Sequence, residues 1–195
     1  MTKEEKQEGT MDMQAAMELY AKLATPGDPH KLLASMEGTW KTKSKCWMEP
    51  GRSPMESEGT SEQKMLVGGR FLQQEFKGDM MGTPFTGLGF TGYDNHTKKY
   101  VTTWMDSMGT GIMFFEGTAG RDGKTITQEA RYDDPVRGPM IWRAVTKYVD
   151  GDTMLFEMYA TAKGGKEEKM MEITYTRKSD RGAAARPGEA KKSVP

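Results

Sequence analysis

The sequence has very few of the residues from which metal and haem sites are built. It contains one cysteine, Cys46, so no disulfide can form within the chain and no cysteine-rich metal cluster is available. Its two histidines are His30, near a helix start, and His96, in a polar turn. Neither stands at an inward strand position from which it could ligate a haem, and the two are not spaced as ligands of one metal ion. We therefore expect no metal and no cofactor.

An excess of one charge and a long apolar run are also missing. Lys and Arg number 28, as do Asp and Glu, so the formal net charge is zero and gives no support to a nucleic-acid partner. No stretch approaches the roughly 20 apolar residues of a membrane span, and the opening MTKEEKQEG lacks the apolar core of a signal peptide. No phosphate-binding glycine loop or nucleophile elbow occurs. We expect a cytoplasmic protein with no membrane partner.

Glycine and methionine, in contrast, are abundant. The 23 Gly are spread evenly, which suits an all-β chain with many turns better than a helical one. Many of the 18 Met stand where Leu, Ile or Val would be usual in a strand. Because Met adapts to irregular space, it suits the lining of a cavity that accepts varied ligands, and compositional drift is the alternative explanation.

The chain divides into two tails, a helical segment and a β domain. Residues 1–10 and 179–195 have the polar composition of disordered tails. In the segment 11–37, apolar residues at helical spacing predict a helix over Met11–Ala24, and Asp28 followed by Pro29 predicts a second, short one ending before Gly38. We expect this segment to act as a lid or plug on the β domain, which spans residues 38–178.

Ten strands are predicted in the β domain, separated by short turns rich in Gly, Asp and Asn. They are Thr39–Met48, Glu58–Val67, Arg70–Gly78, Phe85–Tyr93, Lys99–Asp106, Gly111–Gly117, Lys124–Asp133, Met140–Val149, Thr153–Thr161 and Lys166–Lys178. Links this short join antiparallel neighbours, which makes an antiparallel meander. Ten strands in a meander favour closure into a barrel, because closure removes both exposed edges. A two-sheet sandwich is the alternative, and it needs longer crossing connections.

The alternation of side chains indicates which residues point into the barrel. The inward sets are Trp40, Thr42, Ser44 and Cys46 on the first strand, Tyr100, Trp104 and Asp106 on the fifth, Met140, Trp142, Ala144, Thr146 and Tyr148 on the eighth, and Met171, Ile173, Tyr175 and Arg177 on the last. These sets mix aromatic, Met, hydroxyl and charged side chains. Because polar groups inside a barrel need partners, the mixture indicates a cavity.

Two features stand at the ends of the β domain: Gly38-Thr39-Trp40 forms a G-x-W at the first strand, and Arg177 lies on the last. This combination resembles the calycin superfamily of lipocalins and fatty-acid-binding proteins. In calycins an Arg or Lys stacks over this tryptophan and closes the barrel base, a contact that cation–π attraction favours.

Four phrases of the sequence carry a closer resemblance: HKLLASMEGTW, GLGFTGYDNHTKKYVTTWMDSMGTG, DGDTMLFEMY and KMMEITYTRK. They are similar to a bacterial family of undetermined function, the domain-of-unknown-function family fifteen-seventy-nine. The resemblance covers residues 28–178. It implies a calycin-like barrel and no particular activity.

The candidate ligand-binding residues follow from this arrangement. Trp40 and Arg177 are expected to close the base, and the cavity is expected to be lined or gated by Trp104, Asp106, Trp142, Tyr159 and Tyr175. Asp106 has the alternative role of forming a turn after its strand. Glu157 or Arg131 could belong to a buried ion-pair network with Arg177.

Three hypotheses about function remain open. The first is a binding protein for a small, largely apolar ligand held inside the barrel. The second is an enzyme that uses Asp106 and Glu157 as an acid/base pair, which requires both carboxyl groups in one cleft. The third is an interaction module or homodimer that uses an outer patch containing Met105, Met113 and Phe115.

Overall fold

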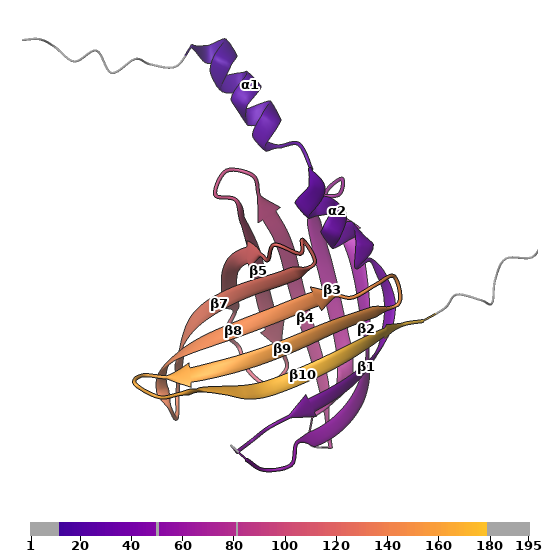
Figure 1. Ribbon diagram of the computed structural model, residues 1–195, viewed down its shortest axis with the longest axis vertical. Helices are drawn as coiled ribbons and strands as arrows, with labels where there is room; N and C mark the ends of the chain where they lie inside the picture. Colours follow the sequence, from indigo (N-terminus) through magenta and orange to yellow (C-terminus); the bar gives the residue numbers. More distant parts are fainter. Residues whose placement is uncertain (1–11, 50, 81, 179–195) are drawn as a thin grey trace, which may run out of the picture.

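The computed structural model describes residues 12–49, 51–80 and 82–178, so the two predicted tails lie outside the described residues (Figure 1). Two helices, α1 (Met13–Leu23) and α2 (Asp28–Ser35), precede ten strands, as the sequence predicts. Among the described residues, neither helix has the length and apolar character needed to cross a bilayer.

The strands form one closed antiparallel barrel. They are β1 (Gly38–Cys46), β2 (Met55–Leu66), β3 (Phe71–Met80), β4 (Thr83–Asp94), β5 (Lys99–Asp106), β6 (Met113–Ala119), β7 (Thr125–Asp134), β8 (Gly138–Tyr148), β9 (Thr153–Ala162) and β10 (Glu167–Arg177). Each pairs with its neighbour in the chain, and β1 pairs with β10 to close the sheet. The predicted meander barrel is confirmed, and the sandwich alternative is wrong because the sheet has no free edge.

Helix α2 covers the end of the barrel at which β1 begins (Figure 1). Its Leu33 is 1% exposed, and Met36, at its C-terminal end, is 3% exposed. The indole N–H of the fully buried Trp40 donates a hydrogen bond of 3.0 Å to the carbonyl of Met36. The predicted plug is therefore confirmed for α2, which closes this end with apolar side chains.

Helix α1 does not pack on the barrel, and the expectation that it would is wrong. Figure 1 shows it extending away from the strands, with Met13 and Tyr20 both more than 70% exposed. Its C-terminal end is held by the Asn95 amide, which donates to the carbonyls of Leu23 and Thr25 at 2.8 Å each, and by Arg70, whose Nε donates to the carbonyl of Ala24 at 3.1 Å. None of the residues of α1 is buried, so its apolar side chains gain no packing energy from the barrel.

The contact between Arg177 and Trp40 joins the last strand to the first. The two residues are partners in the β1–β10 register, and the guanidinium lies 4.0 Å from the centre of the indole ring. The guanidinium also donates to the carbonyls of Ser35 (2.9 Å), Glu37 (2.5 Å) and Gly151. One side chain thus ties together the end of α2, β1, β10 and the turn between β8 and β9.

His30 is part of the plug. Its side chain is only 5% exposed, its Nδ1 accepts the N–H of Gly27 at 3.0 Å, and its ring packs edge-on against Tyr93. His30 thus caps the start of α2 from a buried position. Desolvation lowers the pKa of His30. His96 is exposed in the turn after β4, as predicted.

We predict that Arg177→Leu lowers the free energy of unfolding by about 2–4 kcal/mol, because three carbonyl contacts and the stacking on Trp40 are lost together. Arg177→Lys is expected to recover only part of the loss, since an ammonium group cannot form the guanidinium's planar fork. Urea unfolding measures both values. Arg131→Leu, at an exposed position of β7, is the control and should stay within about 0.5 kcal/mol of the wild type. An equal loss of unfolding free energy in both leucine variants would contradict this stabilising role of Arg177.

We also predict that His30 makes the fold sensitive to mild acid. Because its pKa in the folded state lies below its ordinary value of 6.5, the stability that neutral His30 contributes is fully present above about pH 6.5. It is lost as the pH falls through the folded-state pKa. His30→Gln should reduce the loss of stability between pH 7.5 and pH 5, and the exposed control His96→Gln should not. Equal pH slopes in all three proteins would refute this role.

Candidate functional site

A cavity of about 360 Å³ lies inside the barrel, and all ten strands and α2 contribute to its wall. Most of the wall is aromatic or aliphatic, and seven methionines take part in it: Met36, Met80, Met108, Met113, Met154, Met158 and Met171. The plug residues Leu33 and Met36 form part of the wall at the closed end. The interior of the barrel therefore contains a cavity and is not a fully packed core.

Four of the seven candidate site residues line this cavity: Trp104, Asp106, Trp142 and Tyr175. Trp40 and Arg177 lie at the closed end of the barrel and hold the plug, as described above. Cys46 also lines the cavity, as its inward position on the first strand predicts, and burial raises the pKa of its thiol.

Tyr159 lies on the outer face of the barrel, which corrects its expected position. On β9, Met154, Phe156 and Met158 line the cavity, so the alternation places Tyr159 on the opposite side of the sheet. The Arg143 guanidinium lies 4.1 Å from the centre of the Tyr159 ring. The sequence did not reveal this because β9 carries apolar residues on both faces.

Glu157 shares that outer face with Tyr159. Its carboxylate pairs with Lys169, which also bonds Glu172 at 2.9 Å, and this pairing lowers the pKa of Glu157. The expected ion pair of Glu157 with Arg177 does not form, since Arg177 bonds main-chain carbonyls instead. Asp106 faces the cavity, so the two carboxyl groups lie on opposite sides of the sheet. The acid/base pair required by the enzyme hypothesis is therefore not assembled.

Asp106 holds Trp104 in place. Its Oδ2 accepts the indole N–H of Trp104 at 2.9 Å, and its Oδ1 accepts the main-chain N–H of Met108 at 2.9 Å. The aspartate thus forms the turn after β5 and also fixes a tryptophan of the cavity wall. The Trp104 ring lies against Gly87 and Gly89 of β4, where the lack of a side chain leaves room for it.

The outer patch predicted from Met105, Met113 and Phe115 is not formed. Met113 and Phe115 line the cavity, and Phe115 is 4% exposed. Their neighbour Phe114 is 64% exposed instead, because the run Met113-Phe114-Phe115 offers apolar side chains to both faces. The alternation within this strand could not be assigned from the sequence.

Several polar side chains of the cavity wall are hydrogen-bonded to one another. The glutamines among them were not predicted from the sequence. The Gln74 amide donates to Ser61 at 3.1 Å and to the Tyr175 hydroxyl at 3.2 Å. Burial raises the pKa of Tyr175 to about 12, so this phenol stays neutral at physiological pH. Gln63 and Gln128 belong to the same wall. The alternation Ile126, Gln128, Ala130 in the predicted seventh strand was the signal that could have placed Gln128 inside.

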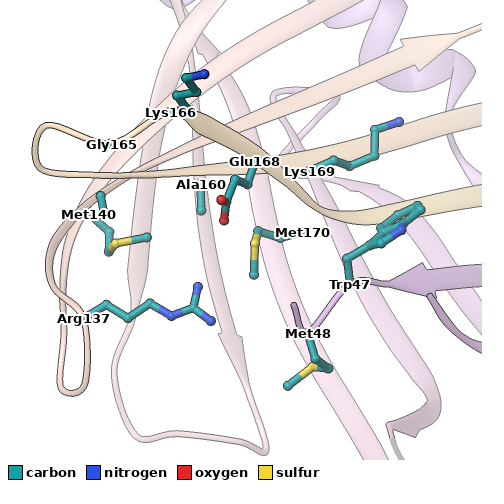
Figure 2. Close-up of a pocket in the computed structure, with 11 residues that line it drawn as sticks. Trp47, Met48, Arg137, Met140, Ala160, Gly165, Lys166, Glu168, Lys169 and Met170 are labelled. Atoms are coloured by element: carbon teal, nitrogen blue, oxygen red, sulfur yellow. The ribbon is translucent and has the colours of Figure 1, made fainter. Parts of the chain in front are cut away.

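A second, smaller pocket of about 240 Å³ lies at the opposite end of the barrel from α2. It is bounded by the turns before β8 and β10 and by Trp47 and Met48, which follow β1. In Figure 2, Lys166 and Lys169 point away from Arg137, Glu168 and Met170. Its wall includes the buried residues Met140 of β8 and Ala160 of β9. The same two strands carry Trp142 and Met158 of the larger cavity, so the two spaces adjoin at this end of the barrel.

Residues 25–177 match the model of the family described as "Protein of unknown function (DUF1579)". The chain belongs to the DUF1579 family. This is the family that the four sequence phrases indicated, and the match covers the plug and all ten strands. No curated protein matches the chain.

Solved structures show the same barrel fold in distant proteins. The structure of Rv2717c from M. tuberculosis is 15% identical, with a TM-score of 0.57 over 79% of this chain and 99% of that one. The S-type phycobiliprotein lyase CPES from Guillardia theta is 10% identical, with a TM-score of 0.56 over 77% of this chain and 93% of that one. At such identities the likeness concerns the barrel fold alone.

We predict that Gly87→Ala displaces the Trp104 ring, because a Cβ at this position would overlap it. Overpacking of this kind costs about 1–3 kcal/mol of unfolding free energy. The double variant Gly87→Ala/Trp104→Leu should be less destabilised than the sum of the two single variants, since the smaller side chain removes the overlap. Denaturant unfolding of all four proteins gives the coupling energy. If the loss of unfolding free energy in the double variant equals the sum of the losses in the two single variants, the contact between Gly87 and Trp104 is contradicted.

Proposed function

We propose that this DUF1579 protein binds a small, largely apolar molecule inside the barrel. The observation that supports this most strongly is the cavity of about 360 Å³, which falls within the range of about 300–1,000 Å³ usual for small-molecule sites. Its wall combines a large apolar surface with a few oriented polar groups. Such walls give affinity through apolar burial and orientation through hydrogen bonds.

The methionines of the wall favour a binding role over a purely structural one. A barrel filled only for stability is packed mainly with branched aliphatic side chains in fixed rotamers. Seven unbranched Met side chains can adjust to the shape of a guest at small cost. The aromatic side chains Trp104, Trp142 and Phe115 offer flat surfaces beside them. A compact aromatic or alicyclic molecule suits this wall.

The plug makes the opposite end of the barrel the route of entry. Arg177 and Trp40 fasten α2 over one end through the contacts described above. The other end carries the loops after β1 and β5, and Met108 of the latter loop belongs to the cavity wall. A guest would enter past these loops, because α2 blocks the other end.

Two expectations from the sequence remain predictions. Location in the cytoplasm is consistent with a single thiol, Cys46. Association into a homodimer would have to use a surface other than the patch of Met105, Met113 and Phe115, since the last two line the cavity.

We predict that Ala144→Phe abolishes ligand binding while leaving the barrel folded. Ala144 is 7% exposed and lines the cavity, so a phenyl group there would occupy the space for a guest. The test compares native mass spectra of the wild type and the variant, each purified without denaturation and mixed with a panel of small apolar compounds. Val145→Phe, on the outer face of the same strand, is the matched control and should bind like the wild type. Equal binding by all three proteins, or binding by none, would contradict an interior site.

A further inference from the structure

Two hydrogen-bond donors in the cavity wall have no partner within the described part of the protein. They are the side-chain amide nitrogen Nε2 of Gln128 and the indole nitrogen Nε1 of Trp142. Both atoms are buried, and Gln128 as a whole is only 6% exposed. Leaving a buried donor without an acceptor destabilises a protein, so a donor held in this way at a cavity indicates an acceptor supplied by a guest.

A chain of hydroxyl groups fixes the orientation of the Gln128 amide. The Thr102 hydroxyl donates to Oε1 of Gln128 at 3.0 Å, and it lies 2.9 Å from the Thr91 hydroxyl. Because each hydroxyl has one proton, Thr91 then donates to Thr102. The carbonyl oxygen of Gln128 is thereby engaged, and both of its N–H groups remain as donors.

Gln128 and Trp142 are close neighbours in the wall. In the register of β7 and β8, Gln128 pairs with Ala144 and Ala130 pairs with Trp142. Gln128 and Trp142 are therefore diagonal neighbours on the interior face, a separation of about 7–8 Å that long side chains bridge. Both nitrogen atoms are covered by neighbouring atoms, so a small polar group of a guest would reach both donors by inserting between the two side chains.

The charged side chains of the cavity wall indicate whether the acceptor of the guest is neutral or anionic. Among the described residues that line the cavity there is no Lys, Arg or His, and the carboxyl groups present are those of Asp79 and Asp106. An anionic guest would be desolvated without a compensating cation and beside two acidic groups. A neutral acceptor receives the same two hydrogen bonds without that penalty.

From this geometry we propose that the guest is a neutral apolar molecule with a carbonyl-type oxygen, such as a ketone, ester or amide, bound by Gln128 and Trp142. This inference rests on the proposed function and specifies the ligand class. The two cavity tryptophans differ in this role. The indole N–H of Trp104 is already donated to Asp106, so only that of Trp142 is proposed to bind the guest.

The test uses three probes of nearly equal shape. They are 2-acetylnaphthalene, which carries a carbonyl oxygen; 2-isopropenylnaphthalene, in which a methylene group replaces that oxygen; and 2-naphthoate, an anion. Calorimetric titration of the full chain should give roughly tenfold tighter binding of the ketone than of the alkene, as expected for two neutral hydrogen bonds. The anion should bind least tightly.

Variants assign the preference to the two donors. In Gln128→Met/Trp142→Phe the ratio of ketone to alkene affinity should fall to about one, because both donors are removed. Thr127→Met/Ile141→Phe is the matched control: it places the same side chains on the outer faces of the same two strands, so the ratio should be retained. In the wild type, nitrogen-15 NMR should show the indole N–H of Trp142 moving downfield with the ketone and not with the alkene.

The outcomes separate this inference from the function on which it rests. Equal affinity for ketone and alkene, or tightest binding of the naphthoate, would overturn the inference and leave ligand binding intact. Failure of all three probes to bind would count against the proposed function and the inference together. The NMR measurement needs no variant, so a folding defect in the double variant does not remove the test.

Discussion

Closure of the barrel depends on the contact between Arg177 and Trp40. A ten-stranded meander can close only if its first and last strands pair, and these two residues face each other in that pairing. The guanidinium stacks on the indole and also bonds carbonyls at the end of α2. The same side chain therefore joins the first and last strands and holds α2 over the end of the barrel. Gly38 is part of this arrangement, because its backbone has a φ of +133° and a Cβ there would overlap the guanidinium.

The plug and the wall together produce a space that is closed at one end and lined by adaptable side chains. Leu33 and Met36 seal the end near Trp40, and strand residues supply the rest of the wall. Two kinds of polar group are then left inside. Those of Asp106 and Gln74 are engaged with other side chains, whereas the donors of Gln128 and Trp142 have no partner among the described residues. The first group holds the cavity wall in shape, and the second is the group that we propose binds the guest.

The barrel could be predicted from the sequence because its turns and its clearest strands carry unambiguous signals. Short Gly- and Asp-rich links required antiparallel neighbours, and the first strand alternates lysines with Trp40, Thr42 and Ser44. The failures occurred where a strand is apolar on both faces. Tyr159 and Phe115 both stand in such runs, and the alternation could not choose a side for them. Gln128 was missed because glutamine carries neither charge nor hydrophobicity to mark its face. The exposure of α1 could not be predicted, because apolar spacing within a helix does not show whether the barrel offers a surface for it.

A crystal structure of the protein with 2-acetylnaphthalene would show directly whether the interior of the barrel is a binding site. We expect electron density for the naphthalene rings among the methionines of the cavity, with the carbonyl oxygen within hydrogen-bond distance of Gln128 Nε2 and Trp142 Nε1. Density confined to the outer surface, or an interior closed up by the side chains of its wall, would contradict an interior binding site.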